Sequence, residues 1–98
     1  MHQIKREMGC SPADLVRWLP QALHELYSQT SLVIDGIELL TPQDPLLRIS
    51  GLTQPARKIA LLNIPVLDLS LSFSSSFTRD RLNDVMRRFD LYTRRGGG

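Results

Sequence analysis

The single cysteine, Cys10, is the side chain best suited to covalent chemistry, because it directly precedes Ser11 at the predicted start of a helix. A thiol at a helix N-terminus lies near the positive end of the helix dipole, which lowers its pKa and favours a reactive thiolate. The chain has no second cysteine that would resolve an oxidised thiol, and nothing in the sequence places His2 or His24 beside Cys10. We therefore expect a small thiol packed at a strand-to-helix corner, with a reactive thiol as the alternative.

No metal or cofactor site is predicted. A usual catalytic zinc site takes three protein ligands, whereas His2 and His24 supply at most two imidazoles and the acidic residues are scattered. The phosphate-binding patterns GxGxxG and GxxxxGK and the nucleophile-elbow pattern GxSxG do not occur. We expect no metal, no cofactor and no catalytic residues, and enzymatic activity is the less favoured interpretation.

Positive charge is concentrated near the C-terminus. Residues 1–78 carry six basic and seven acidic groups, whereas residues 79–98 carry six arginines and three aspartates. Arginine accounts for ten of the twelve basic residues, and its guanidinium pairs bidentately with carboxylates and phosphates. The residues expected to contact a partner are Trp18, Arg87, Arg88, Tyr92, Arg94 and Arg95. Trp18 is expected to lie either in the core or at an interface, and the sequence favours neither.

Nucleic-acid binding is the weaker interpretation of these arginines. Aspartates interleave with them and partly neutralise the row, for example through a pair of Asp84 and Arg88 one helical turn apart. The segment also lacks the interleaved aromatic residues of a single-strand binding platform. We therefore predict a solvated, salt-bridged helix face, with weak, salt-dependent nucleic-acid binding as an alternative.

The chain closes on three glycines, residues 96–98, after Arg94 and Arg95. This ending resembles that of ubiquitin-like sulfur carriers, whose thin diglycine tail enters an activating enzyme. The resemblance implies that Gly98 is the acceptor of an activated acyl or sulfur group. Those carriers open with a β-hairpin and end on a strand, whereas here a strand leads directly into a helix and a second helix precedes the glycines.

The first half of the chain predicts a strand, a helix and a hairpin. Residues 3–8 alternate in the manner of a strand, and Ser11-Pro12-Ala13-Asp14 is a capping-box start for a helix that reaches about Tyr27. Pro20 interrupts this helix, so we expect a kink or a break there. Asp35-Gly36 between two β-prone runs predicts a hairpin, with a glycine bulge as the alternative.

The second half predicts further strands and a closing helix. We expect a short strand over residues 46–50, a loop over residues 51–56 and a strand over residues 59–64, with Pro65 marking a bulge or an edge. Leucine and phenylalanine then alternate strictly with aspartate and serine from residue 67 to residue 74, which predicts a strand with one buried face. Thr78 is the expected N-cap of the last helix, whose apolar stripe consists of Leu82, Val85, Met86 and Phe89.

These elements predict an α+β fold. Its order is one strand, a helix, four or five strands and a helix, with consecutive strands forming a mainly antiparallel meander and both helices covering one face of a two-layer sandwich. We expect a single domain over residues 1–95, followed by a flexible glycine tail over residues 96–98. The chain has neither a secretory signal nor an apolar run long enough to span a bilayer, so a cytoplasmic location without membrane contact is expected.

The segments GCSPADLVRWLP and FDLYTRRGGG resemble the two ends of a group of small uncharacterised bacterial proteins of about this length. The resemblance implies a stand-alone bacterial domain and no catalytic activity. We therefore expect a non-enzymatic binding or assembly domain that uses an open sheet face or edge to contact a protein partner or a second copy of itself. A carrier that uses its glycine tail and a weak nucleic-acid binder are the alternatives.

Overall fold

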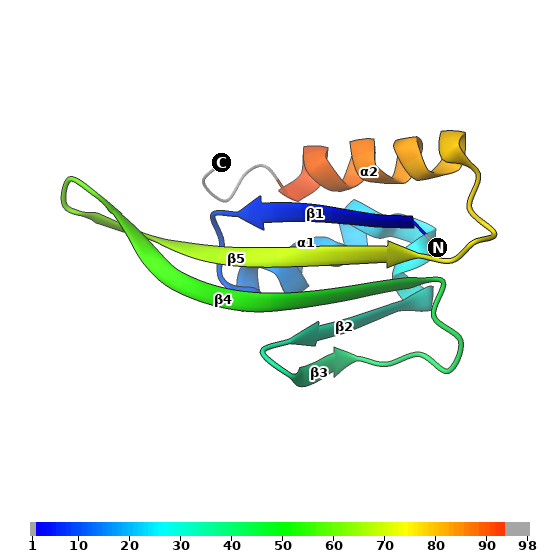
Figure 1. Ribbon diagram of the computed structural model, residues 1–98, viewed down its shortest axis with the longest axis horizontal. Coiled ribbons are helices and arrows are strands. Elements are labelled where there is room, and N and C mark those ends of the chain that lie inside the picture. Colours follow the sequence, from blue (N-terminus) through cyan, green and yellow to red (C-terminus); the bar gives the residue numbers. More distant parts are fainter. Residues whose placement is uncertain (1, 94–98) are drawn as a thin grey trace.

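The computed structural model describes residues 2–93, which form one five-stranded sheet covered on one face by two α-helices (Figure 1). The elements are β1 (His2–Met8), α1 (Pro12–Leu23), the 3-10 helix η1 (His24–Gln29), β2 (Thr30–Ile34), β3 (Ile37–Leu40), β4 (Leu47–Ile59), β5 (Leu62–Phe73) and α2 (Arg79–Thr93). The strands lie in the order β1-β5-β4-β2-β3. The predicted α+β sandwich with a mainly antiparallel sheet is therefore confirmed.

Helix α1 begins as predicted and does not break at Pro20. The Ser11 hydroxyl accepts a hydrogen bond from the backbone N–H of Asp14, and the Asp14 carboxylate accepts one from the backbone N–H of Ser11. Of the kink or break expected at Pro20, the break is wrong, because the helix continues to Leu23 with its apolar stripe buried and Pro20 facing solvent. The helix ends at His24, where φ is 53° and the backbone N–H bonds to the carbonyl of Pro20.

The predicted hairpin at Asp35-Gly36 is confirmed, since both residues have a positive φ and join β2 to β3. The meander beyond it is wrong, because β4 pairs with β2 in parallel rather than with β3. The buried residues Leu47 and Ile49 of β4 therefore lie in the middle of the sheet, whereas the mostly exposed β3 lies at its edge. The Asp35 carboxylate accepts hydrogen bonds from the backbone N–H and the hydroxyl of Thr53, both at 2.8 Å, which holds this turn against β4.

Strands β4 and β5 are longer than predicted. The expected loop over residues 51–56 belongs to β4, and the expected strand over residues 59–64 contains the two-residue turn between β4 and β5. Gly51 has no turn role; it is buried where a Cβ atom would lie 2.6 Å from Cδ1 of Ile34 and 2.8 Å from Cδ2 of Leu69. The bulge expected at Pro65 occurs, with the extra residue on β4 between Gln54 and Arg57.

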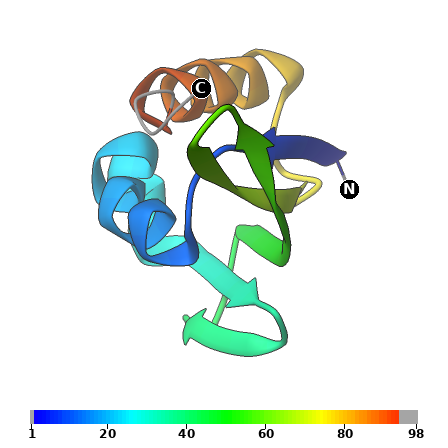
Figure 2. The same cartoon turned by 90° about the vertical axis from the view of Figure 1, so that its left-hand side faces the viewer.

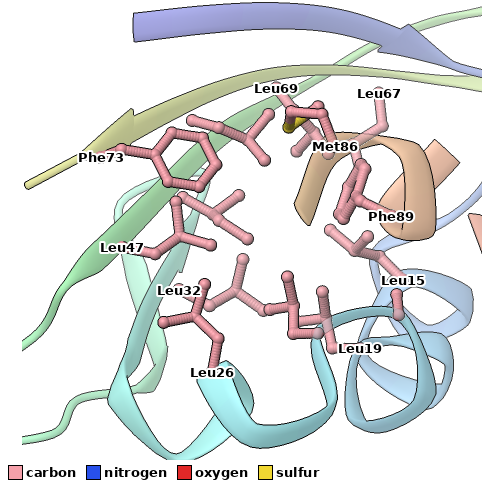
Figure 3. Close-up of a cluster of buried hydrophobic side chains, with 14 of the residues drawn as sticks. Leu15, Leu19, Leu26, Leu32, Leu47, Leu67, Leu69, Phe73, Met86 and Phe89 are labelled. Carbon is pink, nitrogen blue, oxygen red and sulfur yellow. The ribbon is translucent and has the colours of Figure 1, made fainter. Parts of the chain in front are cut away.

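One hydrophobic core lies between the sheet and the helices (Figure 3). The alternation predicted for residues 67–74 is confirmed, because the leucines of β5 and Phe73 are buried in this core. Thr78 caps α2 as predicted, since its hydroxyl accepts the backbone N–H of Arg81. Helix α2 is also tied to β1, because Arg6 donates two hydrogen bonds to the Asp90 carboxylate at 3.0 and 3.1 Å, which raises the pKa of Arg6.

Candidate functional site

The sheet face opposite the helices, called here the open face, is lined by small and charged side chains. Strand pairing places Lys5 of β1 beside Ser70 of β5, and Ser70 beside Ser50 of β4. The same register aligns Glu7 with Asp68 and Leu52. The full set that shares this face on these three strands is Gln3, Lys5, Glu7, Arg48, Ser50, Leu52, Asp68, Ser70 and Ser72.

Two hollows lie on the open face. The larger one, with a volume of about 600 Å³, lies between β1, β5, β4 and β2, and its apolar lining includes the half-buried Val33 and the exposed Leu52. Its charged lining consists of Lys5, Arg6, Glu7 and Asp68. The second, about 480 Å³, lies beside the loop that connects β3 to β4 and includes Glu38 and Arg48. These volumes fall within the range of ligand-binding clefts in proteins. The hollow of about 600 Å³ is called the hollow below.

The far half of the β4–β5 hairpin, residues 52–66, leaves the sheet and is called here the arm. The last pair between β2 and β4 joins Ile34 to Gly51, and the last pair between β1 and β5 joins Met8 to Leu67. Beyond these pairs, β4 and β5 pair only with each other, and no other strand of the described chain lies beside them. Figure 1 shows the arm extending past the ends of β1 and β2, and Figure 2 looks toward its tip, with both helices to one side.

The arm has an apolar side that continues the open face. Residues directly opposite each other in an antiparallel pair share one side, and alternate residues along a strand do too. The row of Asp68 and Ser70 on β5 therefore continues outward through three apolar residues, and their partners on β4 lie on the same side. This apolar side consists of Ile59, Leu62, Ile64 and Val66, with the polar residues Gln54 and Arg57 among them. Lys58 and Asn63 lie on the opposite side.

An ion pair confirms which way this side faces. The guanidinium of Arg57 lies 2.6 Å from the carboxylate of Glu7, which belongs to the open face of β1. Arg57 therefore reaches back from the arm toward the hollow. Both partners are more than half exposed, so the pair adds little to stability, but it shows which side of the arm continues the open face.

Exposed large apolar residues are concentrated on the arm. Leu61 at the tip is fully exposed (101%), and Leu62, Leu52 and Ile59 are exposed by 65%, 59% and 52%. Of the seven large hydrophobic residues exposed within residues 2–93, these four lie on the arm, whereas Ile37 and Leu39 lie on β3 and Leu91 on α2. Single exposed apolar residues are ordinary, but a cluster of this kind indicates an interaction surface.

The backbone of the arm is protected against unspecific strand addition. Pro55 and Pro65 have no N–H to donate, and the bulge between Gln54 and Arg57 disrupts regular pairing; both features limit edge-to-edge aggregation. In the two-residue turn, Ala60 has a φ of 55°. Residues other than glycine adopt this backbone conformation only with a steric cost in free energy. The exposed Leu61 therefore follows a strained residue at the apex.

Cys10 is a packed thiol. Its exposure is 2%, and burial together with the nearby charge of Asp14 raises the pKa of the thiol to about 11. With this pKa the thiol stays protonated at neutral pH. This is the opposite of a reactive thiolate, and the described residues contain no cluster of metal-ligating side chains either.

The aromatic and basic residues proposed as partner contacts are partly engaged within the chain. Trp18 is half-buried against the core. Arg88 donates to the carbonyl of Gln21 at 2.9 Å and lies over the ring of Tyr92 at 4.7 Å.

The ion pair on α2 also differs from the expected one. Asp84 pairs with Arg87 at 3.7 Å, so the predicted pair with Arg88 is wrong. Arg88 instead joins α2 to α1. Arg94, Arg95 and the glycines, Gly98 included, lie outside the described residues.

Sequence reasoning missed the arm. The segment IALL, residues 59–62, is apolar throughout and carries no glycine, asparagine or aspartate that would signal a turn. The sequence therefore predicts that these residues begin a strand over residues 59–64. The available signal was the pair of prolines on either side, Pro55 and Pro65, which frame a symmetrical hairpin.

No family model, no curated protein and no solved structure matches this chain. Among the residues that the structure describes, no helix is both long and apolar enough to cross a membrane.

Proposed function

We propose that this protein is a binding or assembly domain that contacts a protein partner through the arm and the open face, and that it is not an enzyme. The observation that carries the proposal is the one-sided apolar arm, which projects from the sheet with Leu61 fully exposed at its tip. Burying such residues against a partner is favourable by the same effect that forms the core. A partner must therefore offer an apolar surface shaped to receive a narrow ribbon.

Nucleic acid fits this surface less well than protein does. The arm carries only two basic residues, Arg57 and Lys58, and Arg57 is already paired with Glu7. Two phosphate contacts give only weak binding, with a slope of log K against log salt concentration of about −2. The proposal includes a cytoplasmic location, on the ground that one lone buried thiol suits a reducing compartment.

The test places a photo-crosslinking amino acid at position 61 in cells that produce the protein. The matched control carries the same amino acid at position 91, because Leu91 is also exposed, by 60%, but lies on α2. Irradiation should attach a discrete protein to position 61 and none to position 91. Absence of an adduct at position 61, or equal adducts at both positions, would contradict the proposal.

A further inference from the structure

We infer that the second hollow of the open face, with its volume of about 480 Å³, binds a free α-amino acid between the carboxylate of Glu38 and the guanidinium of Arg48. This ligand site goes beyond the proposed protein contact, because it lies beside the loop between β3 and β4 and away from the arm. Three features of the second hollow carry the inference: its two opposite charges, its unpartnered hydroxyl groups and its fixed wall.

The two charges face the same space without neutralising each other. Among the described residues that line the second hollow, Glu38 and Arg48 are the only charged ones, and both are exposed. Strand pairing aligns Glu38 with Val33 and Val33 with Ser50, whereas Arg48 lies two residues before Ser50 on β4. The spacing of strands and residues therefore puts the Cα atoms of Glu38 and Arg48 about 12 Å apart. Neither residue takes part in an ion pair within residues 2–93.

Three serine hydroxyl groups surround Arg48 on the sheet. Ser31 and Ser72 are its direct neighbours on β2 and β5, and Ser50 follows two residues later on β4. All three serines line the second hollow, and none of their hydroxyls forms a hydrogen bond within the described part of the chain. Such hydroxyls can donate to a carboxylate that the guanidinium of Arg48 holds.

The loop between β3 and β4 forms a wall of the second hollow and is fixed at its end. Pro42 and Pro45 line the hollow, and the ring of each proline fixes its own φ angle. The backbone N–H of Leu46 then donates to the carbonyl of Gln29, and the carbonyl of Leu46 accepts from the N–H of Ser74, both at 2.9 Å. A wall held in this way is formed before a ligand arrives, which lowers the entropic cost of binding.

A small zwitterion matches this lining better than a simple ion does. An anion would pair with Arg48 but would also face the carboxylate of Glu38, and a cation would face the reverse conflict. The carboxylate of an α-amino acid can pair bidentately with the guanidinium. Its ammonium group can donate to the Glu38 oxygen that remains free, because the Thr41 hydroxyl occupies only the other oxygen, at 3.3 Å. A nucleotide fits less well, since none of the described lining residues is an aromatic on which a base could stack.

The experiment follows the backbone amide signals of the full chain by NMR while each standard α-amino acid is added separately. The final concentration is about 10 mM, at which a site with a Kd of about 1 mM is mostly occupied. At least one amino acid should shift the signals of Ser31, Ser50 and Ser72 along a saturable curve and leave that of Leu61 unchanged. The N-acetyl and the carboxamide derivatives of that amino acid each lack one charge and should bind at least about tenfold more weakly.

Two substitutions test the residues that hold the ligand. Arg48→Gln and Glu38→Gln should each weaken binding at least about tenfold, because each removes one charged partner. The matched controls are Arg79→Gln and Glu25→Gln, which change the same residue types at exposed positions outside the second hollow and should leave binding unchanged. All four side chains are exposed, so none of these changes should alter the free energy of unfolding, which urea unfolding measures.

The inference is overturned if no amino acid shifts the three serine signals at about 10 mM. It is also overturned if a derivative with a single charge binds as tightly as the parent amino acid, or if inorganic phosphate does, because the hollow would then recognise a simple ion. Binding that Arg48→Gln and Glu38→Gln do not weaken would place the ligand elsewhere. None of these results bears on the photo-adduct at position 61, so the proposed function is tested separately.

Discussion

Gly51 lies where the arm leaves the sheet, and we expect any side chain there to loosen that junction. A Cβ atom at this position would lie 2.6 Å from Cδ1 of Ile34, 2.8 Å from Cδ2 of Leu69 and 3.3 Å from the backbone oxygen of Asp68. Both side chains are 3% exposed and are held in the core, so they have little room to move away. Overpacking of this kind costs about 1–3 kcal/mol. Alanine recovers about 0.5–1 kcal/mol of backbone entropy relative to glycine.

Taken at the middle of these ranges, the two effects leave Gly51→Ala with a net loss of about 1 kcal/mol in the free energy of unfolding, which lowers the melting temperature by about 4–8 °C in a domain of this size. Urea unfolding followed by the fluorescence of Trp18, the single tryptophan, measures it. The midpoint should fall and the slope should stay unchanged.

A second substitution identifies the responsible atom. Ile34→Val deletes the Cδ1 methyl group that would lie closest to the new side chain. Alone it costs about 0.5–1.5 kcal/mol, but it should cost less, or stabilise, when combined with Gly51→Ala. A stabilising effect of Gly51→Ala would contradict this reasoning. So would simple additivity of Gly51→Ala and Ile34→Val, because the two changes would then not act through the same close contact.

Three further predictions concern other parts of the chain. Breaking the half-exposed pair of Arg6 and Asp90, by Asp90→Asn, should cost about 0.5–1 kcal/mol in urea unfolding, and the cost should shrink at high salt because surface charges are screened. The Cys10 thiol, whose pKa is raised from 9.0 to about 11, stays neutral in the folded chain while the unfolded chain ionises, so stability should fall as the pH rises from 9 toward 11. Cys10→Ala should flatten that fall, and an unchanged slope would contradict the assignment. Ala60→Gly should stabilise the chain by up to about 1 kcal/mol, because glycine adopts the positive φ of 55° without strain. Leu61→Gly, at a residue without a positive φ, should give no such gain in thermal unfolding.

Local signals predicted the elements whose chemistry is contained in a few neighbouring residues. The capping box of Ser11 and Asp14 and the positive-φ turn of Asp35 and Gly36 need only their own side chains and backbone, and both formed as expected. The buried face of β5 was equally clear, because strict alternation has a period that a helix cannot satisfy. The packed state of Cys10 was also the favoured interpretation, since a free cysteine is among the most buried residue types.

Features that depend on distant partners were not predictable in the same way. The parallel pairing of β2 with β4 requires the chain to pass over β3 and return to the other edge of β2. No residue type in the loop between β3 and β4 predicts this path. Pro20 shows the reverse case, because a local helix breaker was outweighed by the burial of Leu19 and Leu23 on the sheet. The glycine at position 51 looked like a loop residue, although only its contacts with two other strands explain it.

The separation of the arm from the core is what makes the proposed interface testable. Leu61 and Leu62 contribute nothing to the buried cluster, whereas Ile34 and Leu69, which frame Gly51 at the base of the arm, belong to it. Changes at the tip should therefore alter association without altering the free energy of unfolding of the single chain, whereas Gly51→Ala should lower that free energy. If the tip binds no partner, changing it should alter neither association nor the free energy of unfolding. Association measured on tip variants of unchanged stability thus distinguishes a binding surface from apolar residues that are merely exposed.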